Sequence, residues 1–108
     1  MGDYTKTIHE FYYVIGLDDF STHNILKVNR ETDKMLYGDV LDYAGVPFGR
    51  FALNKRKLNV VDSISDRKYG LVYRVQIDDS SETEARVKAK EIVYTHLIEI
   101  AENFKKES

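Results

Sequence analysis

Residues 69–78, YGLVYRVQID, carry the clearest structural pattern in this chain of 108 residues. Their side chains alternate with a period of two, which is typical of a β-strand. One face of this strand would carry Tyr69, Leu71, Tyr73, Val75 and Ile77, and the other Gly70, Val72, Arg74, Gln76 and Asp78. We expect the first face to pack on a core and the second to meet water or a partner.

The other strands are predicted outward from this one. The polar residues 65–68, SDRK, predict a turn that joins it to a strand over residues 57–64. Three earlier segments, 9–17, 24–30 and 34–40, also have strand character, and ETD at 31–33 predicts a hairpin turn. Both faces of 9–17 are largely apolar, which indicates a strand well inside the sheet. Residues 39–45 fit either a short helix capped by Asp39 or an extended segment.

A long helix is predicted from about Glu82 to Phe104. Ser81 and Glu84 have the spacing of a capping box, in which the serine side chain accepts a hydrogen bond from an early backbone N–H. One broad apolar face is formed by Ala85, Ala89, Ile92, Val93, His96, Leu97, Ile100 and Phe104. Apolar surface extends beyond this face through Val87, Tyr94, Ile98 and Ala101. The helix is therefore either a core helix buried on two sides or one that self-associates through these four residues.

Together these elements predict an α+β fold, an antiparallel sheet of about five strands with a long C-terminal helix packed on one face. We expect residues 1–108 to form a single domain, since 43% of them are hydrophobic and 31% charged, as in globular proteins. The absence of cysteine excludes disulfides and thiolate chemistry. No leader is visible and no apolar run approaches the ~20 residues of a membrane span, so we expect a cytoplasmic protein without membrane contact.

The middle of the chain is basic although the whole carries a net charge of −2. Residues 47–78 hold seven basic and three acidic side chains, and residues 43–57, YAGVPFGRFALNKRK, combine these charges with aromatics, glycines and the single proline. We expect a glycine–proline turn leading into a basic strand, with Lys57 and Lys68 close together across the following hairpin. The candidate binding residues, for a protein partner or nucleic acid, are Tyr43, Phe48, Arg50, Phe51, Lys55, Arg56, Lys57, Arg67, Lys68 and Arg74. Equally, the aromatics could close one end of the core while the charges protect a sheet edge.

Motifs for catalysis are not found in the sequence. It lacks a P-loop, a dinucleotide-binding glycine pattern, a nucleophile elbow and a zinc-protease helix motif. His96 is expected to pack in the core or an interface. A metal site is not expected at His9 and His23 with their neighbouring aspartates, because the spacing fits no ligand pattern. An acid–base site is not expected at the pairs Asp18-Asp19 and Asp78-Asp79. We therefore predict no catalytic residues, no metal site and no cofactor.

The function predicted from these features is that of a small, non-enzymatic binding or regulatory module that acts through protein–protein contacts, as a homodimer. In composition the chain is similar to accessory and inhibitor proteins of bacteria and mobile elements, which is a likeness of class alone. The alternative is a nucleic-acid-binding protein that uses the basic, aromatic-flanked segment 43–74.

Overall fold

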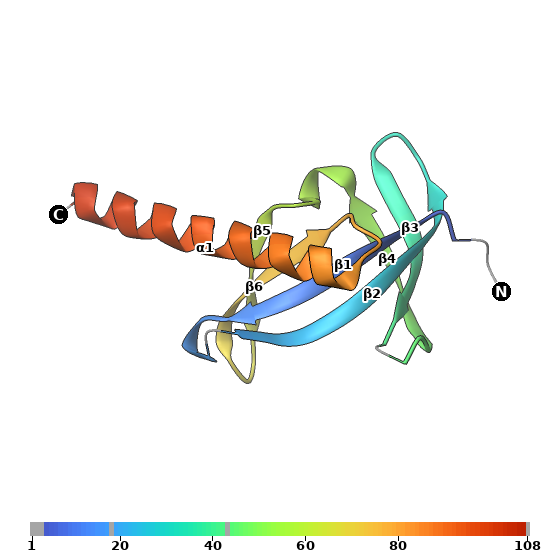
Figure 1. Ribbon diagram of the computed structural model, residues 1–108, viewed down its shortest axis with the longest axis horizontal. Helices are drawn as coiled ribbons and strands as arrows, with labels where there is room; N and C mark the ends of the chain where they lie inside the picture. Colours follow the sequence, from blue (N-terminus) through green and yellow to red (C-terminus); the bar gives the residue numbers. More distant parts are fainter. Residues whose placement is uncertain (1–3, 18, 43, 108) are drawn as a thin grey trace.

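Six antiparallel strands and one long helix make up the fold, in a computed structural model that describes residues 4–17, 19–42 and 44–107 (Figure 1). The sheet order is β4-β3-β2-β1-β6-β5. The elements in chain order are β1 (Lys6–Val14), η1 (Ile15–Leu17), β2 (Asp19–Glu31), β3 (Met35–Leu41), β4 (Pro47–Asn54), η2 (Lys55–Lys57), β5 (Val61–Asp66), β6 (Gly70–Ile77) and α1 (Glu82–Glu107). The predicted fold class is confirmed, and the sixth strand is β4.

Several strand boundaries differ from the predictions, among them the start of β2, which is Asp19 where residue 24 was expected. The first strand ends at Val14, and residues 15–17 form the short 3-10 helix η1. The strand predicted over 57–64 begins only at Val61, because residues 55–57 form the 3-10 helix η2. Residues up to Leu41 are extended, so the short helix considered for 39–45 is wrong. Asp42 instead ends the strand, since its side chain accepts hydrogen bonds from the backbone N–H groups of Ala44 and Val46.

Helix α1 and the outer face of the sheet enclose the first core. Its fully or nearly fully buried residues are Phe11, Tyr13, Tyr73, Val75, Ile77, Ala85, Ala89 and Val93. The two alanines let the helix approach the sheet closely, and Val93 fills the space one turn later. The Ser81 hydroxyl accepts a hydrogen bond from the Glu84 N–H at 3.3 Å, which confirms the serine half of the predicted capping box. The Ser81 N–H donates to Asp79 Oδ1 at 2.9 Å and not to Glu84, as the box would require.

The inner face of the sheet holds a second core, because the sheet curls on itself (Figure 1). Five buried residues form it, Ile8, Leu26, Val28, Leu36 and Leu53, and Leu58 packs on them after η2. The expectation that the second face of residues 69–78 meets water or a partner is therefore wrong in part. Val72 is only 2% exposed and Gln76 only 8%, since the curled sheet encloses them.

Candidate binding surfaces

Helix α1 packs on the sheet with its first 16 residues, Glu82 to Leu97. Its main contacts are to β1, β5 and β6, its first turns also reach His23 and Phe20 of β2, and Leu97 is the last residue that packs against the core beneath it. The following ten residues add about 15 Å of helix at 1.5 Å per residue, and Figure 1 shows this end projecting past the sheet. The helix of this domain is thus longer than the sheet it covers.

The four predicted self-association residues are all exposed, Val87, Tyr94, Ile98 and Ala101. At 100° per residue they lie on the side of α1 opposite the buried alanines. Tyr94 also makes an edge contact with the Tyr13 ring, 6.4 Å between centroids, so part of its surface is used within the chain. Sequence reasoning placed Ile100 and Phe104 on the core face, but they lie beyond the sheet and are exposed, Phe104 by 71%.

The predicted basic binding residues do not form one surface. Lys55, Arg56 and Lys57 lie in η2, so the expected basic strand is wrong for these three residues. Arg67 and Lys68 lie in the turn at the far end of the β5–β6 hairpin. The β5–β6 register pairs Val61 with Val75 and Asp66 with Gly70, which places Lys57 and Lys68 at opposite ends of the hairpin. Their expected proximity is therefore wrong.

The remaining members of the predicted set are divided between the two faces. Arg74 faces the interior of the curled sheet, where its Nη2 donates to Asp62 Oδ2 at 2.6 Å. Phe51 is half-buried against the inner core, whereas Phe48 and Arg50 on β4 are exposed. Tyr43 lies outside the described residues. Strand β4 thus contributes Phe51 to the core and leaves Phe48 at the surface.

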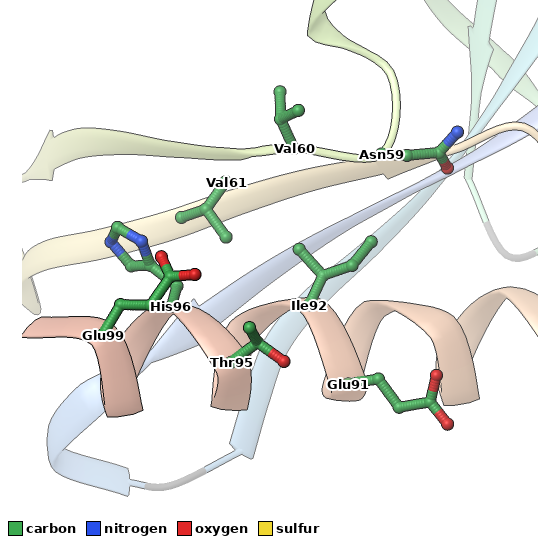
Figure 2. A pocket seen from close by; sticks show the side chains of 8 residues that line it. All are labelled: Asn59, Val60, Val61, Glu91, Ile92, Thr95, His96 and Glu99. Carbon is green, nitrogen blue, oxygen red and sulfur yellow. The ribbon is translucent and has the colours of Figure 1, made fainter.

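A groove runs between β5 and α1 (Figure 2). Its volume is about 510 Å³, and its lining consists of Asn59, Val60, Val61, Glu91, Ile92, Thr95, His96 and Glu99. Val61, Ile92 and His96 point between the strand and the helix. The His96 ring makes an edge contact with Tyr73 at 5.0 Å between centroids, as expected for a packing histidine. The floor of the groove is apolar and Glu91 and Glu99 lie at its rim, so the groove suits a partner segment that has an apolar side chain flanked by basic residues.

His9 and His23 face one another, which the sequence did not reveal. His9 Nδ1 lies 2.8 Å from His23 Nε2, and His23 Nδ1 lies 3.2 Å from Glu82 Oε1 at the start of α1. A carboxylate only accepts, so His23 Nδ1 carries a hydrogen, and a neutral His23 then accepts at Nε2 from His9 Nδ1–H. Register explains the meeting, since β1 and β2 place Phe11 opposite His23 and His9 beside them. Within the described residues, no three or more His, Cys, Asp or Glu side chains gather to hold a metal ion.

Acidification between pH 7 and 5 is expected to lower the melting temperature by a few degrees. Burial lowers the pKa of His23, against the opposing effect of Glu82. The unfolded chain, with a histidine pKa of ~6.5, then binds a proton more readily than the folded chain, so stability falls as pH drops through that value. Thermal unfolding followed by circular dichroism at stepped pH measures this slope.

His23→Gln should flatten the profile in that window, while His96→Gln, which leaves the His9–His23 pair intact, should retain the slope of the parent. A parent protein whose melting temperature is constant from pH 7 to 5 would contradict the assignment.

Polar side chains cross the inner face beside the second core. Glu10 accepts a hydrogen bond from Gln76 Nε2 at 2.7 Å and another from Asn24 Nδ2 at 3.1 Å. Tyr12 lies between Glu10 and Arg74, and burial together with the Glu10 charge raises the pKa of its hydroxyl. The chain of contacts runs through four neighbouring strands, β2, β1, β6 and β5, and so ties the curled sheet together across its width.

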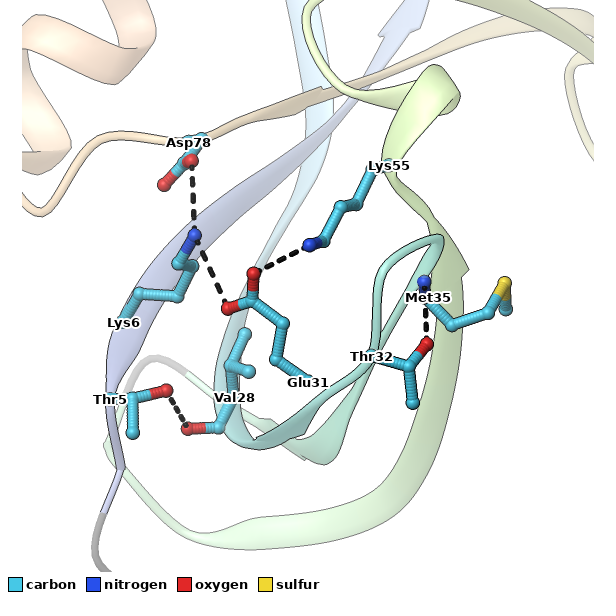
Figure 3. Close-up of polar contacts among 8 residues, drawn as sticks. All are labelled: Thr5, Lys6, Val28, Glu31, Thr32, Met35, Lys55 and Asp78. Atoms are coloured by element: carbon cyan, nitrogen blue, oxygen red, sulfur yellow. Dashed lines mark hydrogen bonds and ion pairs between the residues drawn. The ribbon is translucent and has the colours of Figure 1, made fainter.

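An ion-pair cluster closes the other end of the curl (Figure 3). Glu31 on β2 lies 2.6 Å from Lys55 Nζ of η2 and 3.7 Å from Lys6 Nζ of β1, and Lys6 is also 3.8 Å from Asp78. The hydrogen bond from Lys55 lowers the pKa of Glu31. Lys55, predicted as a binding residue, therefore has a partner within the chain.

In the described part of the chain, no helix is long and apolar enough to span a membrane.

Comparison with protein-family models, curated proteins and solved structures finds no match to this chain.

Proposed function

We propose that the protein is a non-enzymatic binding module that acts through protein–protein contacts and self-associates through the side of α1 that carries Val87, Tyr94, Ile98 and Ala101. The observation that supports this is the free end of α1, which projects past the sheet (Figure 1) and carries exposed apolar side chains, Ile98 and Phe104 among them. Soluble proteins seldom maintain such an end without a partner, because exposed contiguous apolar surface favours association.

The amount of apolar surface supports a second helix as the partner. Five side chains on α1 are at least 44% exposed, Val87, Tyr94, Ile98, Ile100 and Phe104. Since one fully exposed aromatic side chain presents ~150–250 Å², together they present on the order of 500 Å². Val87, Tyr94 and Ile98 share one side of α1 with Ala101, whereas Ile100 and Phe104 lie roughly 90–130° around the helix. The first side with its polar borders therefore supplies part of the ~800 Å² that a standard interface buries per partner.

The charges beside the apolar stripe formed by Val87, Tyr94, Ile98 and Ala101 favour a second copy in parallel orientation. Glu91 and Glu102 border it on one side and Lys90 on the other, given 100° per residue. In a parallel pair around a two-fold axis, opposite borders of the two helices face each other, so Lys90 approaches the acidic border of its partner. A second copy therefore matches both the apolar and the charged features of this surface.

Sedimentation equilibrium of the parent protein should report about twice the chain mass of 12.6 kDa. Ile98→Glu should yield monomer with an unchanged circular-dichroism spectrum, because it places a charge in the interface without touching the core. Tyr94→Glu should also yield monomer, with a small loss of stability from the lost Tyr13 contact.

Asn103→Glu is the matched control, since it adds the same charge to the same free end but on the side of α1 away from Ile98. It should remain dimeric. A parent protein that sediments as a monomer at micromolar concentration would refute self-association, and so would an Ile98→Glu variant that stays dimeric.

A further inference from the structure

A β-bulge in β2 turns Arg30 to the outer face of the sheet. Val28 pairs with Gly38 and Arg30 pairs with Tyr37, which leaves Asn29 as an extra residue between them. In an unbroken strand Arg30 would share the inner face with Val28, two positions before it. The bulge reverses that alternation and places Arg30 beside Tyr37 on the outside.

Tyr37 holds the Arg30 guanidinium in a fixed orientation. The guanidinium carbon lies 4.1 Å from the centre of the tyrosine ring, a stacking distance. Stacking restrains the plane of the guanidinium while its N–H groups stay available at the edge for two parallel hydrogen bonds to an oxyanion.

Arg50 on β4 lines the same groove as Arg30, with a volume of about 740 Å³. Among the described residues neither arginine has a carboxylate within ion-pair distance. Asp39, the lining carboxylate, pairs with Arg50 in the β3–β4 register, but its Oδ2 accepts a hydrogen bond from the Tyr4 hydroxyl at 2.8 Å. The described lining therefore has a net charge of +1.

This groove is open because α1 does not cover it. The helix packs mainly on β1, β5 and β6 of the outer face, while the groove lies on the same face over β2, β3 and β4, around Arg30, Tyr37 and Arg50. Two arginines that have no counter-ion among the described residues, one of them fixed by stacking, make a preorganised receptor for a compact anion.

We propose that the groove at the Asn29 bulge binds a phosphate group through Arg30 and Arg50, with Tyr37 positioning Arg30. A phosphate presents pairs of oxygens that match the guanidinium fork, and both a free phosphate compound and the backbone of single-stranded nucleic acid supply it. The site is independent of the self-association surface on α1.

Binding is tested at low salt with two probes, inorganic pyrophosphate by calorimetry and a short oligothymidylate by fluorescence anisotropy. Arg30→Gln and Arg50→Gln should each weaken binding at least tenfold, and Asp39→Asn should strengthen it because a negative charge leaves the groove. Arg67→Gln removes the same charge from the distant β5–β6 turn and should change affinity less than twofold. Circular dichroism checks that each variant is folded.

Preference for pyrophosphate would identify a small phosphate compound as the ligand, and preference for the oligothymidylate would identify single strands. Either result supports the site if the two groove arginines are required. Failure of the parent protein to bind both probes would overturn the proposal, as would an equal loss of affinity in Arg67→Gln, which would indicate attraction to general positive charge.

Discussion

Replacing Gly38 by alanine is expected to reduce the free energy of unfolding by about 3 kcal/mol or more. Gly38 pairs with Val28 beside the bulge in β2, where the two backbones approach closely. An added Cβ would overlap the carbonyl oxygen of Lys27 and lie 2.8 Å from its carbonyl carbon. Because these are backbone atoms, no side-chain rotation relieves the overlap, and β2 and β3 must separate.

Gly49→Ala is the matched control for this change. Gly49 is also a strand glycine, on β4, but an added Cβ there meets no atom within 4 Å. Alanine restricts the unfolded chain, so this variant should be neutral or more stable by up to ~1 kcal/mol. Urea unfolding of both variants measures the difference. Equal stability of the two variants would show that the close approach of β2 and β3 is not a constraint.

Gln76→Leu is expected to destabilise the protein by about 2–3 kcal/mol, because it leaves a buried carboxylate without one of its donors. Glu10 and Gln76 are 7% and 8% exposed, and the hydrogen bond between them is 2.7 Å long. Leucine has a similar volume, so packing is largely conserved and the loss comes from the unpaired Glu10 oxygen.

The double variant Glu10→Leu with Gln76→Leu separates this cause from simple packing damage. Once both partners are apolar, no carboxylate remains buried, and the double variant should lose less stability than the sum of the two single variants. Urea unfolding of the four proteins completes the cycle. Strict additivity would mean that the hydrogen bond carries no coupling energy.

The two surfaces proposed here differ in how far the sequence could predict them. The excess apolar surface of α1 was visible in the sequence, because helical periodicity assigns each residue an angle whatever surrounds it. The sequence does not show where the sheet ends beneath the helix, and for this reason helical periodicity wrongly places Ile100 and Phe104 in the core. The Arg30 groove was invisible, since the Asn29 bulge reverses the alternation on which a strand prediction depends.

The paired histidines show the same limit. His9 and His23 are 14 residues apart, and only the β1–β2 register brings their ring nitrogens within 2.8 Å. The basic segment shows the reverse case, in which proximity predicted from the chain order fails. Its charges are close in sequence but are distributed over η2, β4 and the far turn of a hairpin.

Local sequence patterns suffice to predict the α+β class, the hairpins, the capped C-terminal helix and its excess apolar surface, because these depend on alternation, turn residues and spacing within short segments. Three features became visible only in the folded protein: the sheet curls to enclose a second core, a bulge turns Arg30 outward, and α1 extends past the sheet. Curl and strand register are set by packing between segments far apart in the chain, and no local pattern encodes them.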